Sequence, residues 1–385
     1  MRTSPLPPFQ EPPKRDYNLR WGPVTGRIFG SLQTEFSDNI NLSENNAEAD
    51  AFFFPNAGIG FQWPLSPRNI LEFSLGFGYR AYVDHPELNT FLITPDSKLL
   101  YQMRAGKVNI TFRDAAVLQV DPLSRPDISA ASAPGLLNFR RINNDTSVQA
   151  EYSPRSNLTL VSSYDYVLDR SLNSQFTSLD RDDHGFGVGA YSNFGSAWNV
   201  GINGAATITD FVEPVQNDAI SFSTGPTVSV KVSRFITVEG SVSYTVSDFD
   251  QSGTILDHSD FSGISFGVGV RHNVNSRLFH SVRVARSISP GFLNNFNDLT
   301  VLQYGVNWRL NSFITLNSMF TYEHFDASGA GGESADRFLW YLGSGWQIAR
   351  HWNLGLGYSF ARKDSDQPLR GYQQNRATLD VTYHF

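Results

Sequence analysis

Apolar and polar residues alternate along most of this chain, and this period of two constrains the fold more than any other feature. In the segment 377–385, ATLDVTYHF, the odd positions hold Ala, Leu, Val, Tyr and Phe, and the even positions hold Thr, Asp and His. Successive side chains of a β-strand point to opposite faces, so such a segment has one apolar and one polar face. The pattern recurs from residue 24 onward, which predicts an all-β protein.

The alternation and the turn signals together mark about 18 strands. The segments 97–104 and 107–118 alternate least regularly, and without them the count would be about 16. Short connections, such as 105–107, alternate with long ones, such as 119–143, which is typical of outer-membrane β-barrels. The predicted strands are 23–36, 52–63, 69–83, 97–104, 107–118, 144–153, 157–169, 184–194, 198–211, 220–233, 236–249, 261–273, 278–288, 299–310, 314–325, 337–348, 352–363 and 374–385.

The composition of the two faces favours a membrane barrel over a soluble sandwich. Aromatic residues make up 14% of the chain and gather on the apolar face, while charged residues are only 17%. The other face is mostly Gly, Ser, Asn and Thr, as expected for a wet lumen opposite a lipid-facing wall. No apolar run is long enough for a membrane-spanning helix. We therefore predict a transmembrane antiparallel barrel whose lumen is too wide for its own side chains to fill.

Composition also excludes several function classes. The net charge of −7 argues against a nucleic-acid partner, which would need a basic patch. The chain has no cysteine, which removes disulfide frameworks, thiolate metal sites and cysteine nucleophiles. Neither a G-x-S-x-G nor an H-E-x-x-H motif is present, and no histidine has a partner at catalytic or metal-binding spacing. We expect no enzymatic activity, no cofactor and no metal.

The chain divides into a proline-rich tail, 1–20, and a barrel, 21–385. The tail has no apolar core of the kind that a secretory signal needs, so we expect that such a signal has been removed. Prolines at 5, 7, 8, 12 and 13 predict an extended segment in the periplasm. Two interpretations remain open: a leader without a role, and a contact segment for a periplasmic export partner.

The C-terminal strand carries a family resemblance. Bacterial outer-membrane barrels end in a strand with a terminal aromatic residue that the barrel-assembly machinery uses, and this chain ends in Tyr383, His384 and Phe385. The final hairpin, within 352–376, resembles a β-barrel porin family whose members often accompany exopolysaccharide-export loci. The resemblance implies a pore or export channel in the outer membrane and no chemical reaction, with Tyr383 and Phe385 as the assembly signal.

The parity of each strand predicts which charged residues face the lumen. Both signs occur, so we expect polar and weakly selective passage, whereas a ring of one sign would indicate strong ion selectivity. These charges could instead pair across strands and only hydrate the wall. The predicted pore-lining residues are Arg27, Glu72, Arg80, Arg104, Lys107, Arg113, Glu151, Asp165, Lys231, Glu239, Arg271, Arg283, Arg309, Glu323 and Asp380.

The longest connection, 119–143, is a candidate constriction. Loops of this length without regular structure are usually functional or disordered. Porins fold such a loop into the barrel; the alternative is a flexible surface loop. The charged residues that would act at a constriction are Asp121, Arg125, Asp127, Arg140 and Arg141.

Two sets of aromatic residues lie near strand ends and predict girdles at the membrane interfaces. A sugar-stacking surface inside the pore is the alternative. Beside the short connections are Trp21, Trp63, Trp198, Trp346 and Trp352, and beside the long ones are Tyr82, Tyr166, Tyr244, Phe249, Phe325 and Phe360.

The leading function is therefore an outer-membrane porin that passes hydrophilic solutes. The alternatives are an exopolysaccharide-export barrel with a periplasmic partner, and a structural or surface barrel. The long loops are rich in Asp and Glu, so they are either simply solvated or bridged by divalent cations to lipopolysaccharide. Expected partners are outer-membrane lipid, lipopolysaccharide and the assembly machinery.

Overall fold

The structure is a computed structural model that describes residues 17–120, 123, 125–129, 131, 137 and 139–385. Its residues form one antiparallel sheet of 20 strands, with two short 3₁₀ helices in the connections. The elements are β1 (Leu19–Trp21), β2 (Val24–Ser37), β3 (Asp50–Ser66), β4 (Asn69–Tyr82), η1 (Pro86–Leu88), β5 (Thr90–Ile93), β6 (Lys98–Ala105), β7 (Val108–Gln119), β8 (Arg141–Arg155), β9 (Leu158–Ser171), η4 (Ser174–Leu179), β10 (Arg181–Phe194), β11 (Trp198–Phe211), β12 (Ala219–Lys231), β13 (Ile236–Phe249), β14 (Phe261–Asn273), β15 (Leu278–Pro290), β16 (Phe296–Arg309), β17 (Ile314–Ala327), β18 (Ser334–Ala349), β19 (Trp352–Ser365) and β20 (Tyr372–His384).

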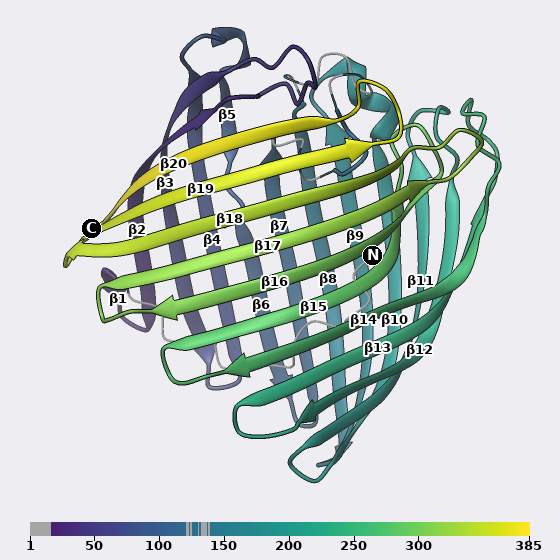
Figure 1. The fold of residues 1–385 in the computed structure, drawn as a ribbon. Coiled ribbons are helices and arrows are strands. Elements are labelled where there is room, and N and C mark those ends of the chain that lie inside the picture. The colour runs from purple at the N-terminus through teal and green to yellow at the C-terminus, as the bar shows by residue number, and fades with distance from the viewer. Residues whose placement is uncertain (1–16, 121–122, 124, 130, 132–136, 138) are drawn as a thin grey trace.

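The sheet closes on itself, because β20 pairs with β2 as well as with β19 (Figure 1). β5 and β6 follow one another along β4 and occupy one position in the ring, and β1 only forms a small hairpin with β2. The result is a closed antiparallel barrel of 18 strands, so the predicted fold class is confirmed. Closure leaves no unpaired edge, as a sheet in hydrocarbon requires.

The interrupted strand is the one place where the strand prediction is incomplete. The predicted strand 97–104 corresponds to β6, and β5 extends it toward the long loops. Between them Ser97 turns inward, and its Oγ lies 3.0 Å from the backbone N and 3.1 Å from the O of Gly76. The hydroxyl accepts from the N–H of Gly76, and the O of Gly76 also accepts from Thr94 N at 2.9 Å, so the break leaves neither backbone group of Gly76 unpaired.

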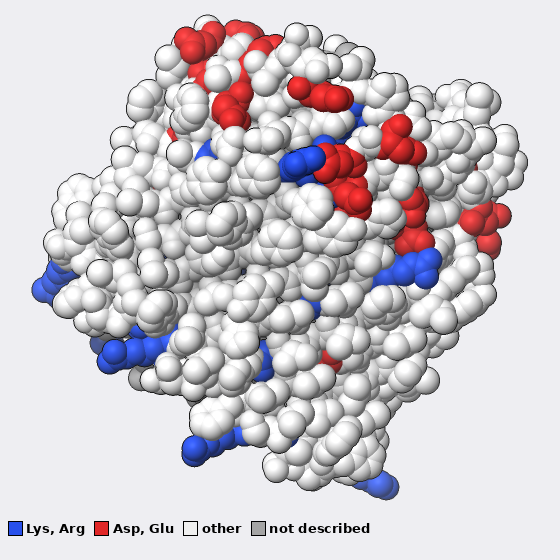
Figure 2. Space-filling view, viewed as in Figure 1, with Lys and Arg blue, Asp and Glu red and all other residues white. Residues whose placement is uncertain are grey.

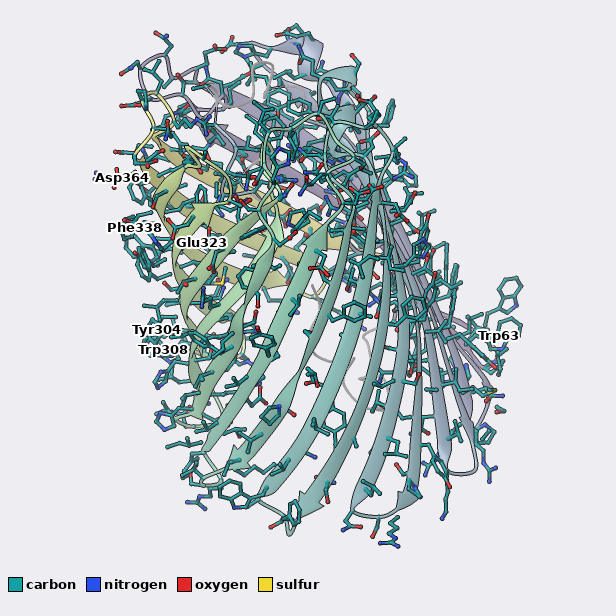
Figure 3. The ribbon with its side chains drawn as sticks, turned by 90° about the vertical axis from the view of Figure 1, so that its right-hand side faces the viewer. Trp63, Tyr304, Trp308, Glu323, Phe338 and Asp364 are labelled. Atoms are coloured by element: carbon teal, nitrogen blue, oxygen red, sulfur yellow. The ribbon has the colours of Figure 1, made fainter. Side chains whose placement is uncertain are left out.

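The outer wall is an apolar belt. Register pairs place Ala190 opposite Ile202 and Val188 opposite Gly204 on one face of β10 and β11, and Ile202 is 59% exposed. Figure 3 shows Trp63, Tyr304 and Trp308 on the outside of the barrel. Large apolar side chains exposed in this number around a closed sheet are expected against lipid and not against water.

The two ends of the barrel carry opposite charge. On the face in Figure 2, acidic residues gather at the end with the long loops, basic residues line the other end, and the band between has few of either. The short turns between β3 and β20, all of which the structure describes, contain no Asp or Glu. Their basic residues are Arg68, Lys107, Arg234, Arg277 and Arg350, and Arg155 ends β8 beside a further turn.

Glycine makes two of these turns tight. Gly106 joins β6 to β7 with φ of +62°, and Gly195 joins β10 to β11 with φ of +64°. This left-handed region costs residues with a Cβ about 1 kcal/mol or more, so glycine is the favoured residue there.

The described residues include no helix with the length and apolar character of a membrane span. The predicted boundary between tail and barrel falls inside β1, since Leu19 and Arg20 pair with Gly26 and Thr25. Residues 1–16 of the predicted tail lie outside the described residues.

Candidate functional site

Every strand presents to the lumen the residues that alternate with its exposed apolar ones. Arg309 follows the exposed Trp308, and Asp380 follows the exposed Leu379. In the strand register, each charged strand residue predicted to line the pore alternates with the outward-facing residues of its strand. Their part in selecting solutes stays a prediction. Lys107 instead lies in the turn between β6 and β7, where its Nζ donates to the carbonyl O of Pro154 at 2.7 Å.

Several of these lumen residues have partners on neighbouring strands. Arg113 Nη1 lies 3.0 Å from Asp145 Oδ2, and Gln62 Nε2 donates to Glu72 Oε1 at 3.4 Å. Arg80 lies over the ring of Phe52 at 4.3 Å. These contacts favour the alternative prediction for the residues concerned, in which lumen charges pair across strands and only hydrate the wall.

Basic residues gather at the turn end of the lumen. Each lies on the inner face close to a short turn, in the region where positive residues also line the turns. They are Arg27, Arg104, Lys231, Arg271 and Arg309. The acidic residues on the same half of the wall, such as Glu151 and Glu239, are fewer, so we infer a positive field in this vestibule.

Between β7 and β8, the described residues of the loop include Leu123, Arg125 and Asp127, which lie across the lumen, and we name this loop the crossing loop. Asn297 Nδ2 of β16 donates to Asp127 Oδ2 at 3.0 Å. Arg337 Nη1 of β18 donates to the carbonyl oxygens of Leu123 at 2.8 Å and Arg125 at 3.2 Å. Since β16 and β18 lie on the far side of the ring from β7 and β8, a loop bonded to both must span the barrel (Figure 1).

The predicted constriction residues have different positions. Arg125 donates through Nη2 to the carbonyl O of Pro290 at 3.1 Å, so it and Asp127 lie at the far wall. Arg140 Nη1 reaches Thr90 Oγ1 at 3.5 Å on the near wall. Arg141 belongs to β8, where Nε lies 2.8 Å from Asp169 Oδ1 and the side chain anchors η4. Asp121 lies outside the described residues.

Electrostatics favour the ionised form of Asp127. Burial opposes ionisation, but the Arg125 guanidinium at 3.3 Å and the Asn297 amide outweigh it and hold the pKa of Asp127 below its usual value. The carboxylate is therefore charged at neutral pH and remains bonded to Arg125 and Asn297. The crossing loop is tied to the far wall by charge-assisted hydrogen bonds, which are the stronger kind.

Described loop residues pack together at the loop end of the lumen. An apolar cluster there combines Leu42, Ile128, Phe139, Phe176 and Phe292, which come from four different loops. Phe139 and Phe176 meet edge to face with ring centroids 5.1 Å apart. A barrel of this width leaves an interior that its strands cannot fill, and at this end loop residues occupy part of it.

Buried ion pairs tie this packed region to the wall. Lys363 Nζ lies 2.8 Å from Glu333 Oε1, with 0% and 2% of the two side chains exposed. Arg337 Nη2 lies 2.5 Å from Glu323 Oε2. Lys363, Glu333 and Arg337 are not among the predicted site residues. Lys363 and Arg337 have lumen parity, so a count extended to the loop ends of the strands would have included them.

The same packing corrects the second set of aromatic residues. Tyr166, Tyr244 and Phe360 have outward parity, as expected of a girdle, but Tyr82, Phe249 and Phe325 face inward. Phe325 is 0% exposed and lies under Lys363. At this end the lumen contains folded loops, so an aromatic side chain is as well accommodated inside the barrel as outside it. The tryptophans of the turn end do lie outward, with Trp63 45% and Trp198 51% exposed.

The predicted assembly residues lie at the seam where the barrel closes. Tyr383 packs on Trp352 at 4.8 Å and on Phe385 at 4.8 Å, and Phe385 N donates to the carbonyl O of Ile28 at 3.4 Å. Their use by an assembly machinery stays a prediction. Across the described residues no group of three or more His, Cys, Asp or Glu side chains could hold a metal ion.

Comparison with known proteins identifies the fold. No protein-family model matches the chain, and no curated protein sequence matches it. Solved porin structures do match over nearly the whole length. A BenF-like porin from Pseudomonas fluorescens matches with a TM-score of 0.53 and 9% identity, over 94% of this chain and 99% of the other. OccK5 (OpdH) from Pseudomonas aeruginosa gives 0.52 and 10%, over 94% and 98%. OccAB3 from Acinetobacter baumannii gives 0.51 and 11%, over 94% and 99%. The fold is that of an outer-membrane β-barrel porin.

Proposed function

We propose that this protein is an outer-membrane channel that passes hydrophilic solutes through its lumen. The crossing loop carries the proposal, since a loop held across the lumen of an 18-strand barrel limits the size of what passes. A polar inner face supports passage of water and solutes, and the apolar belt supports insertion in a bilayer. Selection would then come from the crossing loop and the charges around it.

The barrel has a definite orientation under this proposal. The short, basic turns face the periplasm and the long loops face outward, as in outer-membrane barrels generally. The proline-rich segment 1–20 would then lie in the periplasm. The C-terminal strand would meet the assembly machinery, and the acidic loops would meet lipopolysaccharide. We infer no catalytic step, because a channel needs only binding and release.

Conductance of the purified, refolded protein in a planar lipid bilayer tests the proposal. We expect stable single-channel steps, and we expect liposomes that contain the protein to admit small sugars but exclude larger ones. Heat-modifiable mobility on a gel serves as the control for folding. A barrel that folds by this criterion yet neither conducts nor admits any sugar would overturn the proposal.

A second candidate function is export of an anionic exopolysaccharide with a periplasmic partner. The observation that favours it is the basic vestibule, formed by the short turns and by lumen residues such as Arg27 and Arg271. A positive entrance concentrates polyanions before they enter the pore. Alginate oligomers added on the turn side should then interrupt the current at lower concentration than those added on the loop side. Equal sensitivity from both sides would count against export.

A further inference from the structure

A cavity of about 320 Å³ lies inside the barrel, between the wall formed by β8 to β13 and the inward connection from β15 to β16. Its volume is within the range of small-molecule sites. Gly185, Gly187 and Ala205 on the inner face of the wall leave this space. Ser289, Pro290 and Asn295 border it from the other side. Among the described residues, none that borders the cavity belongs to the crossing loop, which contacts the edge of the cavity through the hydrogen bond from Arg125 to the carbonyl O of Pro290.

One side of the cavity is acidic. Asp145, Asp165 and Asp183 lie on three successive strands, β8, β9 and β10. Asp145 and Asp183 both stand opposite Val167 in the register, and Asp165 stands opposite Gly185, so the three carboxylates lie close together on the wall. Ser163, Thr207 and Thr209 also border the cavity, and Thr209 Oγ1 donates to Asp183 Oδ1 at 2.7 Å.

Two guanidinium groups pair with carboxylates on this side. Arg181 Nε lies 3.0 Å from Asp183 Oδ2, and Arg113 Nη1 lies 3.0 Å from Asp145 Oδ2. Arg181 is itself shared, because its Nη1 lies 3.4 Å from Asp169 Oδ2, and Asp169 also pairs with Arg141. The described lining has three carboxylates and one basic residue, Arg181, so we infer that it favours cations over anions.

The other side of the cavity is aromatic. Phe249 and Phe296 stack with ring centroids 5.9 Å apart, and Phe211 lies on the same lining. Phenyl faces carry negative potential and attract ammonium and guanidinium groups, in addition to burying apolar carbon. Carboxylates facing aromatic rings across a space of this size are suited to an organic cation with an apolar stem.

We propose that this cavity is a binding site for small organic cations, of the amine or guanidine class, on the path through the barrel. The cationic head binds the carboxylates of Asp165 and Asp183, and the carbon stem packs on the phenyl rings of Phe249 and Phe296. This inference rests on the proposed function, because it names the solute class that the channel delays and selects. Anions meet like charge at the acidic wall. Neutral sugars gain hydrogen bonds there but no charge attraction.

The test uses agmatine, a guanidine with an amine at the other end of its chain, as the probe. Titration calorimetry on the detergent-solubilised barrel measures binding, and agmatine-induced current interruptions in a planar bilayer measure the same site during conduction. We expect saturable binding of agmatine, with glutarate and glucose at least about tenfold weaker. Asp165→Asn should weaken agmatine binding by about tenfold or more, because it removes one charge without changing the side-chain shape.

Glu239→Gln is the matched control. Glu239 lies on the inner face of β13 but outside the cavity, so agmatine binding should stay within about twofold of the wild-type value. Ala205→Phe provides a second, steric variant that fills the cavity and leaves every carboxylate in place. It should also abolish binding.

The outcomes separate this inference from the proposed function. A barrel that conducts but binds agmatine no better than glutarate or glucose overturns the cation site and leaves the channel intact. Equal loss in Asp165→Asn and Glu239→Gln also overturns it, since attraction would then be general to the lumen. A barrel that binds agmatine by calorimetry but does not conduct supports the site and overturns the channel.

Discussion

At the scale of single residues, the packed loop end of the lumen depends on a few buried charges. Lys363 Nζ has Glu333 at 2.8 Å and the Phe325 ring at 5.2 Å. Glu333 also accepts from Ser365 Oγ at 2.6 Å and pairs with Arg370 at 3.2 Å. An ammonium buried this deeply is tolerated only because of its carboxylate partner, so the pair acts as a unit.

Glu333→Gln should therefore destabilise the folded barrel by about 3 kcal/mol, because it leaves the Lys363 charge buried without a counter-charge. Urea-induced unfolding of the refolded protein measures this change in free energy. Asp364→Asn is the matched control, since Asp364 pairs with Arg362 at the exposed surface and its loss should cost less than about 1 kcal/mol. Similar losses in the two variants would show that burial of the pair is not important.

His85 gives the loops a dependence on pH. Its Nδ1 lies 2.8 Å from Asp50 Oδ2 and its Nε2 lies 3.2 Å from Glu48 Oε2, across the first two long loops. The hydrogen bond with Asp50 raises the pKa of His85 above its usual 6.5 against the effect of burial. The stabilisation is thus complete below the unfolded-state pKa and is lost as the pH rises through the higher folded-state value.

The stability difference between the wild type and His85→Gln should be largest below about pH 6 and should disappear at higher pH. Urea midpoints measured at several pH values provide this comparison. A difference that is constant across the range would mean that His85 contributes by packing and not by charge.

At the scale of elements, the crossing loop is held by side chains of strands far from it in sequence. Arg337 donates to two loop carbonyls and to Glu323 with one planar guanidinium group. A lysine can keep the charge beside Glu323, but it cannot reproduce this fork. The position of the loop therefore depends on the geometry of one side chain as well as on its charge.

Arg337→Lys should loosen the crossing loop. Because each hydrogen bond from a charged donor contributes about 1.5–3 kcal/mol, amide exchange in the loop should accelerate by about tenfold or more. The unit conductance should rise as well. Arg283→Lys is the control: Arg283 also faces the lumen, on β15, at a distance from the loops. A loop that exchanges no faster in Arg337→Lys than in Arg283→Lys would contradict this anchoring.

At the scale of the whole molecule, charge is separated along the barrel axis, with acidic loops at one end and basic turns at the other (Figure 2). A pore with fixed charge of opposite sign at its two mouths accumulates different ions at each of them. Such a pore passes current unequally in the two directions. Salt screens the effect, since the Debye length falls from about 10 Å at 0.1 M to about 3 Å at 1 M.

Single channels inserted in one orientation should therefore rectify at about 0.1 M salt and become nearly ohmic at about 1 M. The combined variant Arg234→Gln, Arg277→Gln and Arg350→Gln should reduce the rectification at low salt, because it removes charge from three short turns. Current–voltage curves of single channels provide the measurement. Rectification that persists unchanged at high salt would indicate a cause other than fixed charge.

The sequence by itself determined the barrel and the orientation of its side chains. Alternation is fixed by the covalent geometry of an extended chain, so Arg283 and Asp380 could be assigned to the inner face from local pattern alone. The number of strands could also be predicted, because each turn has its own local signal in the sequence. This prediction holds only for the regular part of each strand. At the loop ends it is wrong for Tyr82 and Phe325, which were assigned to the outer girdle but face the lumen.

Only the tertiary structure decided what fills the barrel. The hydrogen bond from Asn297 to Asp127 joins residues 170 positions apart, and that from Arg337 to Leu123 joins residues 214 apart. The acidic and aromatic sides of the luminal cavity likewise meet only after closure of the ring. Such contacts depend on how the loops pack inside a closed wall, and no local pattern encodes them. The sequence therefore specifies the wall of the pore, and tertiary packing decides its width and what it can bind.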